Sequence, residues 1–167
     1  MKNTTLGFFG ALVLAGSMFI TGCADPCKDV TCVNGECVEG DCVCDAGYEG
    51  VDCGTALNAK FSGNYSLTET CSTSGGATYA VAVAPKSGSQ TDVSFTGLWE
   101  EPQAIVTAVV GANGTSFNIE KQALGTSGFD ISATSGSITA DGATITISYT
   151  IYSGSTVVET CTGSLTK

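Results

Sequence analysis

The chain has 167 residues, enough for one ordinary domain or two small ones, and 16 acidic residues against six basic ones give a formal net charge of −10. All six basic residues are lysines, and histidine and arginine are absent from the sequence. This composition excludes Ser-His-Asp and Cys-His catalytic arrangements, and it excludes nucleic acid as a partner because phosphate binding relies on lysine and arginine.

The first segment of the chain has the pattern of an export signal. A short basic start, Met1–Asn3, precedes residues 6–20, which are apolar apart from Ser17. As a helix this run would span about 22 Å, short of the roughly 30 Å of a membrane's hydrocarbon core. The pattern therefore predicts a secretory signal peptide, and no later apolar segment is long enough to span a membrane.

The end of the apolar run reads Ile20-Thr21-Gly22-Cys23, which resembles the lipobox of bacterial lipoproteins. The resemblance implies a signal peptide over 1–22, a lipid on Cys23 and a short tether over 23–26. With Ala24 after the cysteine, it also implies an outer-membrane or cell-surface location, with the membrane as a partner through the lipid anchor. Ordinary cleavage after Ala24 is the alternative; it would also remove Cys23 and leave a secreted protein.

Six cysteines follow within a segment of 27 residues, 27–53. They are Cys27, Cys32, Cys37, Cys42, Cys44 and Cys53. So short a segment cannot bury enough apolar surface to fold without covalent support. Exported thiols oxidise, which favours disulfides over a zinc site, but six cysteines allow fifteen pairings and their spacing does not choose among them.

The second half of this segment, Cys42-x-Cys44-x-x-Gly47-Tyr48-x-Gly50-x-x-Cys53, resembles an EGF-like domain. The resemblance implies three disulfides, Cys27–Cys37, Cys32–Cys42 and Cys44–Cys53. The acidic run that precedes the first cysteine of calcium-binding members is missing here. We therefore expect no metal, and we interpret the module's many carboxylates as a solvated acidic surface.

Residues 54–59 have the character of a linker, and 60–167 then alternate between apolar and polar residues. Alternating runs occur at 61–67, 79–83, 93–95, 105–110, 117–119, 129–131, 137–139, 145–151 and 157–165. Such runs, separated by turn residues, predict eight or nine antiparallel strands. The fold class is therefore mainly β, with the EGF-like module followed by an antiparallel barrel or sandwich.

The start of this β domain, Phe61-x-Gly63-x-Tyr65, resembles the opening of lipocalin-like barrels, although the arginine of a lipocalin's last strand is absent. The resemblance implies barrel topology. It also motivates an alternative function, the binding of a small apolar ligand inside the β domain, which fails if inward side chains fill the interior.

Cys71 and Cys161 remain after the lipid-bearing and EGF-like cysteines are assigned, and by exclusion they pair with each other. This bridge closes a loop of about 90 residues, which is worth about 4.6 kcal/mol in the chain-entropy description of disulfides.

The candidate binding residues are Trp99, Glu100 and Glu101, because Leu98–Pro102 combines an indole, two carboxylates and a proline. Adjacent carboxylates usually point apart, so we do not expect a glycosidase pair, and a charged loop with Trp99 tucked into the domain's end is the alternative. We expect a non-catalytic lipoprotein without a cofactor, which displays its two modules to a protein or glycan partner.

Replacing Cys23 tests the anchor. In Cys23→Ala the acyl acceptor is lost, so the chain should leave the membrane fraction or remain unprocessed, as measured by fractionation and intact mass. Ser17→Ala, in the same apolar run, leaves the lipobox and every cysteine intact and is the control. An unmodified mature chain that begins at Asp25 would contradict the prediction.

Overall fold

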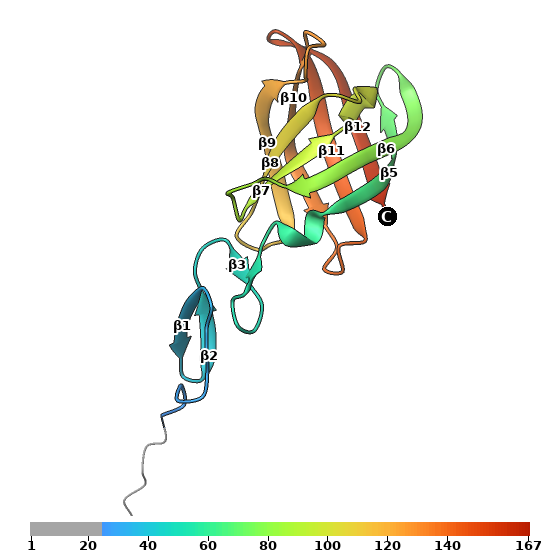
Figure 1. Cartoon of the computed structure of the whole chain (residues 1–167). Helices are drawn as coiled ribbons and strands as arrows, with labels where there is room; N and C mark the ends of the chain where they lie inside the picture. Colours follow the sequence, from blue (N-terminus) through green and yellow to red (C-terminus); the bar gives the residue numbers. More distant parts are fainter. Residues whose placement is uncertain (1–24) are drawn as a thin grey trace, which may run out of the picture.

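The computed structural model describes residues 25–167, which form a small disulfide-rich module followed by a closed β-barrel (Figure 1). The predicted signal peptide and Cys23 lie outside the described residues. Within the described part, no helix is long and apolar enough to cross a membrane.

The module consists of two small antiparallel sheets. Strands β1 (Gly35–Val38) and β2 (Asp41–Cys44) form one sheet, and β3 (Tyr48–Glu49) and β4 (Thr55–Ala56) form the other. Its disulfides are Cys27–Cys37, Cys32–Cys42 and Cys44–Cys53, the pairs that the EGF-like resemblance implies.

Eight antiparallel strands close the barrel in the order β10-β11-β12-β5-β6-β7-β8-β9. Their bounds are β5 Gly63–Cys71, β6 Gly75–Pro85, β7 Asp92–Thr96, β8 Ile105–Val110, β9 Ser116–Ala123, β10 Asp130–Ile138, β11 Thr144–Ser153 and β12 Thr156–Thr166. The mainly β fold is confirmed, and of the two predicted architectures it is the barrel. Two of the predicted runs, 129–131 and 137–139, belong largely to the single strand β10. Phe61 precedes β5, in the 3-10 turn η1 (Ala59–Phe61).

Apolar and polar residues alternate along the sequence because successive residues of each strand face the interior and the exterior of the barrel in turn. In β11, residues Ile145, Ile147, Tyr149 and Ile151 are buried, while the residues between them face outward. The preceding Asp141–Gly142 turn brings β10 and β11 together, with Gly142 at φ 69°, where a glycine is favoured.

Aromatic rings occupy the interior at the end of the barrel nearer the module. The Phe117 ring lies 5.8 Å from that of Phe61 and 5.3 Å from that of Phe95, measured between centroids. Gly136 makes room for Phe117, because a Cβ at this position would overlap the phenyl ring. These rings fill the end of the interior nearer the module, so a lipocalin-like ligand would find no space there.

The predicted linker is an ordered junction between the two modules. Asn58, 2% exposed, donates its side-chain amide to the carbonyls of Ser89 and Asp92, each at 2.8 Å. The Leu57 amide donates to the carbonyl of Gly47 at 2.9 Å, and an ion pair of 2.8 Å joins Lys60 to a carboxylate of β3. These bonds join the module to the barrel on both sides of the linker.

Strands β8 and β9 pair over only two residues, and a side chain completes the rest of their seam. The Gln122 side-chain carbonyl accepts from Thr107 N at 2.9 Å, and its NH₂ group donates to Thr107 O at 2.7 Å. One side chain thus takes the place that a backbone peptide group has elsewhere in the wall.

Gln122→Ala should lower the free energy of unfolding by about 1–3 kcal/mol, because it leaves both backbone groups of Thr107 without their partner. Urea unfolding of the full chain measures this. Gln103→Ala, at an exposed glutamine of the β7–β8 loop, is the control and should change stability little. Equal stability of the two variants would contradict a role for Gln122 in closing the barrel.

Candidate functional site

The candidate loop Leu98–Pro102 lies between β7 and β8, at the barrel end opposite the module, and begins with the 3-10 turn η2 (Leu98–Glu100). Its backbone is unusual, because Trp99 and Glu100 both have φ 55° without being glycines. Non-glycine residues in this region cost about 1–3 kcal/mol each, so surrounding bonds must hold the loop in place.

A series of hydrogen bonds starts at the loop backbone and is the first of these contacts. The Trp99 amide donates to the Tyr79 hydroxyl at 2.8 Å, and that hydroxyl donates to a Glu69 carboxylate oxygen at 2.6 Å. Tyr149 donates to the other Glu69 oxygen, also at 2.6 Å. Glu69 is only 4% exposed, so two tyrosine hydroxyls take the place of water around its carboxylate.

The second contact holds the indole. Trp99 Nε1 donates to Glu159 Oε2 at 2.8 Å, while Glu159 Oε1 accepts from the amides of Ser74 at 2.6 Å and Thr73 at 3.2 Å. The indole also packs edge-on against Phe129, with 5.1 Å between ring centroids. Trp99 is therefore fixed at both its backbone and its side chain.

The pKa shifts follow from these bonds. Burial would raise the pKa of Glu159, but the hydrogen bonds from Trp99 and from the backbone amides outweigh it, and its pKa lies below the usual 4.5. Burial, and then the bond to the Glu69 carboxylate, raise the pKa of Tyr79 and of Tyr149. Both tyrosines are therefore neutral donors, and Glu159 is an ionised acceptor at neutral pH.

The disulfide between Cys71 and Cys161 lies beside this network, joining β5 and β12 with Cα atoms 4.0 Å apart. The Glu69 carboxylate lies within 4.8 Å of both sulfurs. Because the sulfurs are bonded to each other, they offer no thiolate to a metal, and this cluster is a structural junction.

The structure separates the three predicted binding residues. The Trp99 ring is half-buried and bound, Glu101 is half-buried, and Glu100 is exposed. Trp99 thus positions the loop, and the carboxylates are the groups that a partner could reach. Sequence reasoning missed Glu69 and Glu159, although their inward place in the alternation of β5 and β12 was the available signal.

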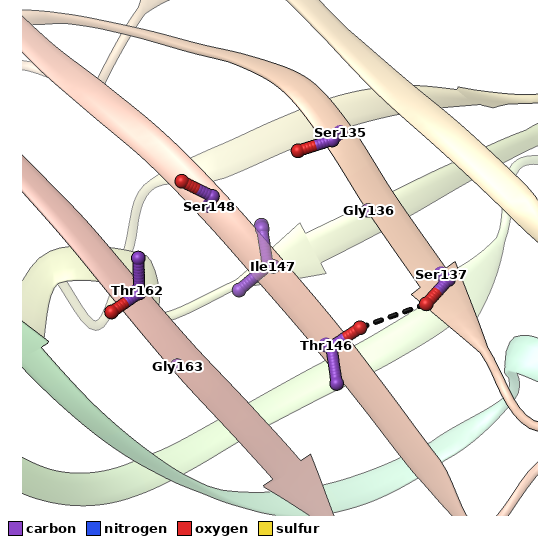
Figure 2. Close-up of a pocket in the computed structure, with 8 residues that line it drawn as sticks. All are labelled: Ser135, Gly136, Ser137, Thr146, Ile147, Ser148, Thr162 and Gly163. Atoms are coloured by element: carbon purple, nitrogen blue, oxygen red, sulfur yellow. Dashed lines mark hydrogen bonds between the residues drawn. The ribbon is translucent and has the colours of Figure 1, made fainter.

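The surface of residues 25–167 carries shallow depressions that open to solvent. One crosses the outer face of β10, β11 and β12 (Figure 2), one lies over β9 and β10, and one lies between the module and the barrel. The Trp99 loop lines none of these three, so any partner that it binds would meet it outside them.

No protein-family model and no curated protein sequence matches the chain. The solved structures that are similar to it include two that match over nearly their whole length. One is described as EF1p2_mFAP2b bound to DFHBI, with a TM-score of 0.45, 17% identity and coverage of 66% of this chain and 98% of that one. The other is a redesigned β-barrel, b11L5F_LGL, with a TM-score of 0.45, 15% identity and coverage of 68% and 96%. Neither likeness identifies a family for this chain.

Acid should destabilise the chain through Glu159. The pKa of Glu159 is lower in the folded chain than in the unfolded chain, so its ionised form stabilises the fold. This stabilisation is present above the unfolded-state pKa near 4.5 and is lost as the pH falls through the lower folded-state pKa. Glu159→Gln should lower the free energy of unfolding at pH 7 by about 1–3 kcal/mol and flatten its decline in acid. Urea unfolding from about pH 7 to about pH 2 measures both effects.

Glu100→Gln, at the exposed carboxylate of the same loop, is the control for removing one negative charge. An acid decline equally steep in Glu159→Gln and in the unsubstituted chain would contradict the assignment.

Proposed function

We propose that this chain is a non-catalytic, lipid-anchored surface protein that recognises a partner through the loop Leu98–Pro102. The observation that carries the proposal is the strained loop backbone, held from two sides by the buried carboxylates of Glu69 and Glu159. A loop held in one conformation loses little entropy on binding, which favours recognition.

The loop's accessible chemistry indicates the kind of partner. Glu100 and Pro102 are exposed and Glu101 is half-buried, so the loop presents an acidic tip. An acidic tip on a chain of charge −10 attracts a surface that carries positive charge. A basic protein surface is thus the partner class that the loop suits best.

The amino-terminal part supplies attachment in this proposal. The lipobox-like Ile20–Cys23 would anchor the chain in the outer membrane, and the EGF-like module would act as a stiff spacer. The ordered junction around Asn58 supports the spacer role, because it joins the module to the barrel by hydrogen bonds. The binding loop would then face away from the membrane.

Catalysis is not part of the proposal. The chain has no histidine to transfer protons and no arginine to hold an anionic substrate. The two buried carboxylates of the barrel accept hydrogen bonds that hold the loop, and Cys71 and Cys161 form a disulfide. An apolar ligand within the barrel would need the space that the packed aromatic rings occupy.

The test uses a matched pair of double variants in the full chain. Partners captured from cell-surface extracts should bind E100Q/E101Q about tenfold more weakly, because the acidic tip is lost. E36Q/E120Q removes the same charge from two exposed sites elsewhere and should bind like the unsubstituted chain. Equal binding by both variants would refute the role of the loop in binding. If the chain hydrolyses a glycoside and E100Q/E101Q abolishes this activity, the non-catalytic role is refuted.

A further inference from the structure

The outer wall of β10, β11 and β12 carries two parallel rows of hydroxyl groups. The strand register aligns Ser135 with Ser148 and Ser148 with Thr162 in one row. A second row consists of Ser137, Thr146 and Ser164, which the register aligns in the same way. Each row runs across the strands, so neighbouring hydroxyl-bearing residues are spaced by about 4.8 Å.

A groove of about 310 Å³ lies between these rows (Figure 2). Its floor is backbone, since Gly136 and Gly163 have no side chain and Ile147 is buried on the inner side. Neither glycine can be replaced by a larger residue without a clash in the core. A Cβ at Gly163 would lie 2.6 Å from Leu67 Cδ1, and one at Gly136 would overlap a core ring. The floor is open on the outside because residues 136, 147 and 163 all occupy inward positions of their strands.

The hydroxyls of one row are free to bind a ligand. Ser137 and Thr146, in the other row, share a hydrogen bond of 2.8 Å, visible in Figure 2. No hydrogen bond within residues 25–167 involves the hydroxyls of Ser135, Ser148 or Thr162. Each of them can both donate and accept a hydrogen bond, as can the hydroxyls of a sugar.

None of the residues that line the groove is charged, although the chain is strongly acidic. In β11, β12, β5 and β6 the only charged residues are Glu69 and Glu159, and both are buried. On β10 the one charged residue, Asp130, begins the strand outside the groove and is paired with Lys121 at 3.5 Å. The hydroxyl rows continue onto β5, where Thr70 and Thr68 align with the ends of the first and second rows. A charged polymer would therefore gain no ion pair in the groove. An uncharged polar polymer needs none.

We propose that this groove binds a neutral, extended polysaccharide, which lies across the strands with its sugar hydroxyls bonded to the free row. The strand spacing is comparable with the length of one pyranose unit in an extended glycan, so successive sugars can meet successive strands. The site is separate from the Trp99 loop and does not rest on the function proposed for it.

The test is a titration of the isotope-labelled full chain, in a zwitterionic detergent, with cellohexaose as the neutral extended glycan. Backbone amide signals of residues 135–137, 146–148 and 162–163 should shift on titration. The triple variant S135A/S148A/T162V should bind at least about tenfold more weakly, because three hydrogen bonds are lost. Carboxymethylated cellohexaose, its charged counterpart, should bind more weakly than the neutral form.

The matched control S94A/T96V/T107V removes three hydroxyls from the outer face of β7 and β8 and should bind normally. The proposal is overturned if cellohexaose causes no shift up to its solubility limit, or if the shifts map to 98–102. Equal binding of the charged glycan would also overturn it. So would groove signals that change with protein concentration alone, since a second copy of the chain would then occupy the face.

Discussion

The burial of two carboxylates without a cation is the constraint on which the far end of the barrel depends. Glu69 and Glu159 point inward from β5 and β12, and neither reaches a lysine among the described residues. An isolated buried carboxylate is costly, so each must be surrounded by donors. Two tyrosine hydroxyls, the Trp99 indole and two backbone amides of the β5–β6 turn meet that need. The shape of the Leu98–Pro102 loop is thus tied to the protein donors that these two acids require.

Two glycines are required by the packing inside the barrel. Gly136 and Gly163 sit at inward positions, where they admit the Phe117 ring and the Leu67 side chain. A larger residue at either position would clash with the core, so the interior packing requires glycine at both positions. The wall also depends on the seam at Gln122, where one amide side chain completes the backbone pairing.

Much of the fold could be predicted from alternation and cysteine count, because both are local or combinatorial signals. The run from Ile145 to Ile151 and the turn before it needed no tertiary information. The choice of barrel over sandwich did, since closure depends on the first barrel strand, β5, meeting the last, β12. The loop at Trp99 was a candidate by composition, but its role could not be read from composition. Glu69 precedes Trp99 by 30 residues and Glu159 follows it by 60, and only the register of β5 and β12 brings both acids to the same barrel end.

The two proposed sites follow from how this chain distributes charge. The inward acids of the barrel are bound by neutral donors, and the outward positions of β11, β12, β5 and β6 carry no charged residue. Charge attracts at long range and sets orientation, whereas hydroxyl rows act only in contact. An acidic tip at Glu100 and an uncharged groove on the wall can therefore engage chemically different partners without competing. The ordered junction at Asn58 would hold both in a fixed relation to the module, and hence to an anchor at Cys23.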